Sequence, residues 1–168
     1  GWVNFEYLCN MKILLDIDGV MIPARPWQSY DLGPDGFGMF SKMAVNNLNR
    51  IISSCQKPEI VLTTSHKNSF SLEDWRKMFD FRGILPTTIS RLNSDSSKMS
   101  RKDEIFNWFL KHQNEKFIVI DDDKGLNALD LNFKENHLVL TASTIGLNSI
   151  ATDETILKIT RLEQLVNS

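Results

Sequence analysis

Two aspartates stand two residues apart, directly after a short apolar segment. Residues 12–15 form that segment, and Asp16, Asp18 and Gly19 follow it closely. In an extended chain, side chains two residues apart point the same way, so both carboxylates face one site. Two carboxylates at one site repel each other unless a cation or a shared proton offsets their charge. Magnesium takes oxygen ligands and binds phosphate oxygens as well, so this pair indicates a Mg²⁺ site that handles phosphate.

Three more groups of polar residues follow further along the chain. They are a hydroxyl run at residues 63–65, a basic pair made by Arg101 and Lys102, and an acidic triplet at residues 121–123. The hydroxyl run and the triplet each come directly after an apolar segment, and the basic pair opens an amphipathic one. Each group alone has a common surface explanation, but together they place acids, hydroxyls and a base in a regular order.

The elements that must position these residues alternate between short apolar and longer amphipathic segments. This alternation predicts an α/β fold, in which helices cover both faces of a mostly parallel five-stranded sheet. Ligand sites in such sheets lie beyond the carboxyl ends of the strands, where the polar groups above occur. The predicted strands are residues 12–16, 59–63, 84–90, 117–120 and 137–140; the predicted helices are residues 40–54, 72–79, 100–111 and 155–166, with Ser71 and Ser100 as N-caps and residues 23–38 as an ordered flap.

Composition narrows the class of protein. The chain has 168 residues, 42% of them hydrophobic, which fits a single domain, and we take residues 11–168 as that domain and residues 1–10 as an N-terminal extension. The net charge of −2 predicts no global attraction to nucleic acid, so a nucleic-acid substrate would need a local basic patch. No apolar run is long enough to cross a membrane. Cys9 and Cys55 form no C-x-x-C pair, which favours free thiols and a cytoplasmic location.

The Asp-x-Asp-Gly segment has two alternative interpretations. An EF-hand loop that begins at Asp16 requires Gly at its sixth position and Glu at its twelfth, but Met21 and Trp27 stand there. That interpretation fails. A D-x-D motif also holds a metal in nucleotide-sugar transferases, and this alternative stays open at the level of the motif.

Taken together, the motifs resemble those of the haloacid dehalogenase-like (HAD) superfamily. The four HAD motifs correspond in order to residues 15–19, residues 61–63, the pair Arg101 and Lys102, and residues 120–122. The resemblance covers about residues 11–160 and implies a three-layer, Rossmann-like domain. More narrowly, the chain is similar to the small HAD domains of RNA-repair (Swiss Army Knife) proteins, in segments that include residues 140–147.

The resemblance implies a phosphatase mechanism. Asp16 attacks phosphorus and forms an aspartyl phosphate, as an ionised carboxylate with an ordinary pKa near 3.9 can do at neutral pH. Asp18 protonates the leaving alcohol and then activates water. Thr63 and a basic side chain bind the phosphoryl group. Arg101 is favoured as that base and Lys102, the commoner residue type in the family, is kept as the alternative.

The resemblance also implies a Mg²⁺ site and contacts to substrate. Its ligands are Asp16, the backbone carbonyl of Asp18, and Asp122, with Asp121 behind them. The family often has another acid about four residues after this pair, but Leu126 and Asn127 occupy that place. Three further residues are candidates for substrate contact, and the aromatic residues of the flap either stack on a base or sugar or pack the flap onto the sheet. The candidates are Gly19, Thr64 and His66, and the aromatic residues are Trp27, Tyr30, Phe37 and Phe40.

The spacing between motifs bears on the substrate. Neither the 44 residues 19–62 nor the 35 residues 66–100 leave room for a full cap domain beside the predicted elements. An open site suits a polymer end, a phosphoprotein, or a small substrate covered by another subunit, and the RNA-repair resemblance favours a nucleic-acid end. Two rival functions remain at this stage: a HAD module that binds phosphate without turnover, and a signalling domain that accepts a phosphoryl group.

Overall fold

A computed structural model describes residues 10–29 and 31–166 of the chain. Residues 1–9 of the predicted extension, which include Cys9, lie outside this part, and so does Tyr30. Cys55 is a free thiol, and its burial raises its pKa to about 12. No helix among the described residues is long and apolar enough to span a membrane.

Five parallel strands form the central sheet, in the order β3-β2-β1-β4-β5. The chain moves from β1 outward to β3 and then returns to the other side of β1 to add β4 and β5. The predicted α/β fold with a five-stranded parallel sheet is confirmed. The strands are β1 (Met11–Leu15), β2 (Pro58–Leu62), β3 (Thr88–Arg91), β4 (Lys116–Asp121) and β5 (Leu138–Leu140).

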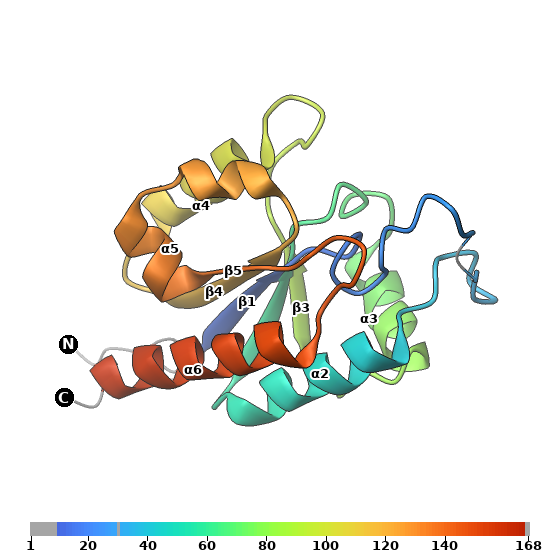
Figure 1. The fold of residues 1–168 in the computed structure, drawn as a ribbon, viewed down its shortest axis with the longest axis horizontal. Coiled ribbons are helices and arrows are strands. Elements are labelled where there is room, and N and C mark those ends of the chain that lie inside the picture. The colour runs from blue at the N-terminus through green and yellow to red at the C-terminus, as the bar shows by residue number, and fades with distance from the viewer. Residues whose placement is uncertain (1–9, 30, 167–168) are drawn as a thin grey trace.

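Helices cover both faces of the sheet (Figure 1). Alternate strand residues explain the two layers, because successive side chains point to opposite faces. Ile13 and Leu15 face a core shared with α2, α3 and α6, whereas Leu14 faces a second core under α4, η1 and α5. The helices are α2 (Lys42–Ser54), α3 (Leu72–Phe81), α4 (Arg101–Lys111), the 3₁₀ helix η1 (Lys124–Ala128), α5 (Leu131–His137) and α6 (Ser149–Val166).

Side-chain caps define where the main helices begin. The hydroxyls of Ser71 and Ser100 accept hydrogen bonds from the backbone N–H groups three residues later, so both predicted N-caps are confirmed. Ser41 caps α2 in the same way, and this helix therefore begins at Lys42 instead of the predicted residue 40. Asn148 Oδ1 accepts from Ala151 N and sets the start of α6 six residues before the predicted one.

Two other boundaries differ from the sequence prediction. The segment predicted as a strand over residues 84–90 is a strand only from Thr88 to Arg91, because residues 84–87 form the connection after α3, where Pro86 offers no N–H and Asn49 accepts from Leu85 N. The helix α5, capped by Asp130, was not predicted. It takes in His137, which the prediction had assigned to the last strand.

The flap after β1 is tied to the body of the domain by one buried arginine. Arg82 NH1 and NH2 donate to Asp35 at 2.6 and 2.9 Å, and Arg82 Nε donates to Gly38 O at 3.0 Å. Phe37 and Phe40 pack edge-on against α3 residues, so the packing interpretation of these two aromatic residues is the one the structure supports. In the described residues, the segments between the motifs form no separate cap domain.

Candidate active site

The candidate site lies where the strand order changes direction, at the carboxyl ends of β1 and β4. Ligands bind at such switch points in open parallel sheets, because the loops diverge there and leave a crevice. Asp16 follows β1 directly and Asp121 ends β4, and the neighbouring strands pair in register up to Leu15 and Ile120. The two carboxylates are therefore placed by the sheet itself, with Asp16 N donating to Ile120 O at 3.1 Å.

Asp16 is a buried carboxylate in an acidic environment. Its residue is 6% exposed, and its Oδ1 accepts a hydrogen bond from Ile17 N at 2.9 Å. Burial raises the pKa of Asp16 to about 8, the charges of Asp121 and Asp122 raise it too, and Arg101 only partly opposes them. The ordinary pKa assumed from the sequence therefore does not apply to the metal-free protein, and a bound cation would favour the ionised form of Asp16.

Arg101 connects the parts of the site. Its NH1 donates to Thr63 Oγ1 at 3.1 Å and to Asp121 Oδ2 at 2.8 Å, and lies 3.5 Å from Asp16 Oδ1. Arg101 occupies the first position of α4, so the helix N-terminus adds its positive dipole to the guanidinium charge. The adjacent Lys102 side chain makes no ion pair with any described residue. Of the two predicted bases, Arg101 is the one that the structure brings to the carboxylates.

The hydroxyl run forms the floor of the site next to Arg101. Thr63 and Thr64 are fully buried, and Thr63 N donates to Leu15 O at 3.1 Å, which continues the pairing of β1 and β2. Thr64 Oγ1 accepts from His66 N at 3.3 Å and so shapes the turn after β2. The side chain of Thr63 therefore faces Arg101, while that of Thr64 is used within its own loop.

Asp18 lies on the open side of the site. Its carboxylate is half exposed, and its Oδ2 lies 3.3 Å from His66 Nε2. The His66 ring in turn packs edge-on against Phe37 of the flap, with ring centroids 5.8 Å apart. A solvent-accessible carboxyl can exchange protons with an alcohol or water, so this position suits the acid/base role inferred for Asp18.

Three carboxylates could hold a metal ion. Oxygens of Asp16, Asp121 and Asp122 lie within 4.8 Å of one another, and all three are hard donors of the kind that Mg²⁺ takes. Asp121 is fully buried and engaged by Arg101, and its burial raises its pKa. Two neighbouring acids with raised pKa values point to a missing positive charge, so the donor set fits a divalent cation. The side chain of Asp18 is not part of this cluster.

Gly19 allows the loop after β1 to pass close to Asp122. Gly19 has a φ of +79°, and a Cβ at this position would lie 2.0 Å from Asp122 Oδ2. Its carbonyl accepts from Thr141 Oγ1 at 2.8 Å. The role of Gly19 in the structure is thus to bring Asp18 and Asp122 to the same loop cluster, whereas the predicted contact between Gly19 and substrate stays a prediction.

The sequence interpretation missed a buried ion pair behind the site. Lys67 Nζ lies 3.0 Å from Glu104 Oε2, both side chains are almost fully buried, and Glu104 Oε1 lies 3.9 Å from Arg101 Nε. Ser94 Oγ donates to Glu104 Oε2, the oxygen next to Lys67, at 2.6 Å. The one signal in the sequence was Glu104 one turn after Arg101, because i and i+3 residues share a helix face.

Comparison with known proteins identifies the family. The family model described as the HAD domain in Swiss Army Knife RNA repair proteins matches residues 12–151. The chain belongs to this HAD family. The predicted membership of the HAD superfamily is confirmed. None of the curated proteins compared with this HAD domain matches it.

Two solved structures resemble the HAD domain described above. One is the cobalt-bound deoxy-D-mannose-octulosonate 8-phosphate phosphatase of Haemophilus influenzae, which is 13% identical, with 95% of this chain and 91% of that chain covered and a TM-score of 0.39. The other is a Vibrio cholerae protein assigned as a 3-deoxy-D-manno-octulosonate 8-phosphate phosphatase. It is also 13% identical, with 94% of this chain and 86% of that chain covered and a TM-score of 0.40.

Proposed function

We propose that this HAD domain is a Mg²⁺-dependent phosphatase that works through an aspartyl phosphate on Asp16 and removes a phosphate from a nucleic-acid end. The observation that carries the proposal is the convergence of Asp16, Arg101 and the pair Asp121 and Asp122 at the carboxyl ends of β1 and β4. A nucleophile, a cation for the phosphoryl oxygens and a set of metal ligands are thereby held within one crevice.

The proposed reaction has two steps. In the first, an Asp16 carboxylate oxygen attacks phosphorus, the bond to the ester oxygen breaks, and Asp18 gives its proton to the leaving alcohol. In the second, Asp18 takes a proton from water, the water oxygen attacks the same phosphorus, and the bond to Asp16 breaks to release inorganic phosphate. The half-exposed position of Asp18, which can face solvent in both steps, supports this assignment.

Arg101 and Thr63 are proposed to bind the phosphoryl oxygens. The guanidinium is already held against Thr63 and Asp121, so little reorganisation is needed when negative charge develops on the transferring group. Lys102 remains the alternative base if α4 shifts on substrate binding. Thr64 and His66, which border this group, are retained as candidate substrate contacts.

The divalent cation is proposed to be held by Asp16, Asp122 and the backbone carbonyl of Asp18, with Asp121 behind them. When bound, Mg²⁺ would neutralise charge on the phosphoryl oxygens. The raised pKa of Asp16 supports this requirement, because the carboxyl must lose its proton before it can act as a nucleophile. The hydrogen bond from Ile17 N to Asp16 Oδ1 fixes the orientation of this carboxyl group.

The nucleic-acid substrate rests on the family and on the open site. The matching family consists of HAD domains in RNA repair proteins, and in the described residues no inserted domain covers the crevice. The net charge of −2 means that a strand must be held by local contacts, not by a general positive field. A cytoplasmic location stays a prediction, for which the free thiol of Cys55 is the support.

The test is phosphate release by the wild type, by Asp16→Asn and by Asp18→Asn, with Asp103→Asn as an exposed-carboxylate control. Substrates are an aryl phosphate, mononucleotides, and oligonucleotides with a 3′ or a 5′ phosphate. We expect Mg²⁺-dependent release that falls by about 10³-fold or more in Asp16→Asn and stays near the wild-type rate in Asp103→Asn. Folded wild type that binds phosphate but releases none would favour the rival function, a phosphate-binding module without turnover.

A further inference from the structure

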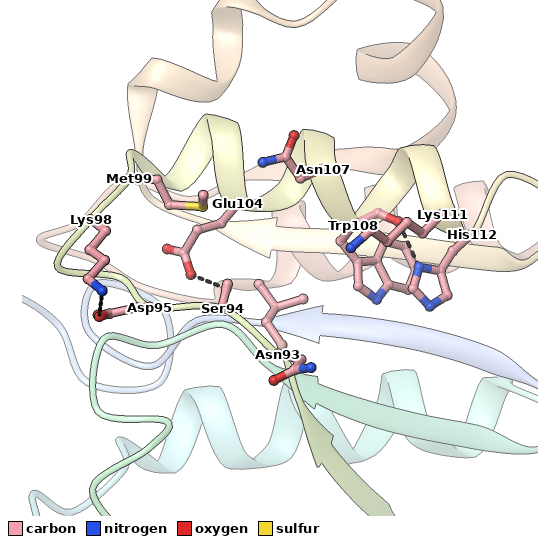
Figure 2. Close-up of a pocket in the computed structure, with 11 residues that line it drawn as sticks. Asn93, Ser94, Asp95, Lys98, Met99, Glu104, Asn107, Trp108, Lys111 and His112 are labelled. Atoms are coloured by element: carbon pink, nitrogen blue, oxygen red, sulfur yellow. Dashed lines mark hydrogen bonds and ion pairs between the residues drawn. The ribbon is translucent and has the colours of Figure 1, made fainter.

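A groove runs along one side of α4 (Figure 2). We call it the α4 groove: it is bounded by residues 92–99 on one side and by the α4 face that carries Glu104, Asn107, Trp108 and Lys111 on the other. Its volume of about 530 Å³ is within the range of small-molecule and nucleotide sites. Nothing in the proposed phosphatase reaction uses this groove.

The groove begins next to the phosphate-binding residues. Met99 and Glu104 line its near end, and Arg101 lies between them in sequence at the start of α4. Trp108 lies about two helical turns further, roughly 10 Å along the axis at 1.5 Å per residue. On this face of the sheet α4 and α5 cover β1, β4 and β5 (Figure 1). The α4 groove lies on the side toward β3, since residues 92–95, which follow β3, line it. The groove therefore starts at the same end of α4 as Arg101.

Two stacked aromatic rings form the wall at the far end of the groove. The Trp108 and His112 rings stack with centroids 4.2 Å apart and planes 8° apart, and both line the groove. His112 Nδ1 lies 2.7 Å from Trp108 O, and Phe117 packs edge-on against Trp108, so the pair is held in one orientation. Rings that are already fixed lose little side-chain entropy when another planar group contacts them. Such walls suit nucleobases, which are planar.

Some polar groups along the groove are hydrogen-bonded within the protein and others are not. Ser94 Oγ and Glu104 Oε2 are hydrogen-bonded to each other, and Lys67 neutralises the Glu104 carboxylate. By contrast, the side-chain amides of Asn93 and Asn107 are exposed and make no hydrogen bond with other described residues. An amide offers both a donor and an acceptor, which matches the mixed edge of a base.

The charges at the two ends favour an anionic ligand. Lys98 Nζ lies 3.9 Å from Asp95 Oδ2 at the near end, a long ion pair between exposed groups that solvent screens. Lys111, at the far end, has no ion pair within the described part of the chain. With Glu104 neutralised by Lys67 and Asp95 by Lys98, the lysine at position 111 leaves the groove with a net positive charge. Phosphate groups of a polymer would complement it.

We propose that the α4 groove binds an unpaired nucleotide of the strand whose phosphate end enters the active site. The base lies against the wall made by Trp108 and His112, the amides of Asn93 and Asn107 meet its edge, and Lys111 contacts a backbone phosphate. This rests on the proposed phosphatase function for the identity of the strand, but the groove itself is tested without any terminal phosphate.

The test measures binding of a fluorescein-labelled, single-stranded RNA hexamer without terminal phosphates, by anisotropy over a range of salt concentrations. Variants are Lys111→Glu and Trp108→Phe, with Lys77→Glu as control because Lys77 is an exposed lysine on α3, away from the groove. We expect Lys111→Glu to weaken binding about tenfold and to make the slope of log K against log salt shallower by about 0.7. Trp108→Phe should weaken binding about threefold and Lys77→Glu by less than about twofold.

Turnover of a small aryl phosphate is measured in the same preparations, because this substrate does not reach the groove. Unchanged turnover with weakened RNA binding in Lys111→Glu supports the groove. The same binding loss without turnover in any preparation supports the groove and contradicts the phosphatase. Equal RNA affinity in wild type and Lys111→Glu, or no affinity in either, overturns the groove proposal. A dimer that Lys111→Glu dissociates, with RNA affinity unchanged, would assign the groove to a second copy of the chain and overturn it as well.

Discussion

At the scale of single residues, the site depends on one arginine that holds two acids and a hydroxyl. Arg101 contacts Thr63, Asp16 and Asp121, which lie at the ends of three different strands. A guanidinium presents several donors in a fixed plane, which an ammonium cannot do. A lysine, the commoner residue type in the family, would contact fewer of these groups at once. An arginine at position 101 therefore suits a site in which the carboxylates are tightly clustered.

Replacing the two adjacent basic residues separates their roles. Arg101→Ala should lower kcat for an aryl phosphate by about 10²- to 10³-fold, since it removes a preorganised cation from the transferring phosphoryl group. Lys102→Ala, the matched control, should change kcat by less than about threefold, because the Lys102 side chain contacts none of the described acids. Steady-state kinetics at saturating Mg²⁺ measure both. A larger loss in Lys102→Ala than in Arg101→Ala would move the phosphate-binding role to the lysine.

The raised pKa of Asp16 predicts how pH and metal act on stability. The pKa of Asp16 is about 8 in the folded metal-free protein and 3.8 in an unfolded chain. Between about pH 4 and pH 8 the folded protein therefore keeps a proton on Asp16 that the unfolded chain has released. The folded state then binds more protons, so this contribution to stability declines as pH rises through that window. Mg²⁺ replaces the proton, so the increase in Tm on adding Mg²⁺ should grow over the same range.

Thermal unfolding with EDTA and with Mg²⁺, at intervals from about pH 5 to pH 8, measures this linkage. Asp16→Asn cannot titrate at this position, so both the decline in Tm with EDTA and the pH-dependent gain with Mg²⁺ should become smaller. Asp121, whose pKa is also raised, should contribute to the slope that remains. A wild type and an Asp16→Asn variant with parallel Tm profiles would show that Asp16 titrates at its ordinary pKa.

At the scale of elements, the buried pair of Lys67 and Glu104 joins the loop after β2 to α4. Both side chains are almost fully buried, and Glu104 also lies within 3.9 Å of Arg101 Nε. Removing one partner leaves an uncompensated buried charge, so Lys67→Met should lower the free energy of unfolding by about 3–5 kcal/mol. The double variant Lys67→Met, Glu104→Gln should recover part of that loss.

Chemical denaturation of the single and double variants measures the coupling between these two residues. Because Arg101 sits on the same helix as Glu104, we also expect aryl phosphatase activity to fall in Lys67→Met at temperatures where the variant is fully folded. The control is Lys77→Met, which breaks the exposed ion pair between Lys77 and Glu73. This change should lower the free energy of unfolding by less than about 1 kcal/mol and leave activity unchanged. Equal costs at the two positions would contradict a special role for the buried pair.

The same element scale shows what the sequence could predict. Strands with continuous apolar runs, such as residues 117–120, and helices with a serine N-cap, such as α4, were predicted within a residue or two, because local periodicity and capping determine them. The short helix α5 was missed, since seven residues with one buried apolar side chain carry little periodic signal. The grouping of the polar residues at the carboxyl ends of the strands could be predicted from the topology of a parallel sheet. The pairing of Lys67 with Glu104 could not, because it joins segments that are distant in the sequence and no local pattern indicates it.

At the scale of the whole molecule, Arg82 fixes the flap to the body of the domain. Arg82 is 5% exposed and binds Asp35 through two nitrogens and Gly38 through a third, so the flap is held against α3. The pKa of Asp35 is lowered to about 2, chiefly by its hydrogen bonds from Arg82, so this clamp persists at neutral pH. The flap, which follows β1 where a cap domain could have been inserted, is therefore held against the body of the domain by Arg82.

An open crevice makes a prediction about substrate length. For phosphate release from single-stranded oligonucleotides, kcat/KM should not fall between a mononucleotide and a strand of about ten nucleotides, because nothing in the described chain must close over the substrate. Arg82→Lys, which loses the bidentate contact with Asp35, should loosen the flap and affect short and long substrates alike. A steep loss of kcat/KM with length in the wild type would mean that the flap, or a second subunit, closes over the site, and the substrate would then be a small metabolite.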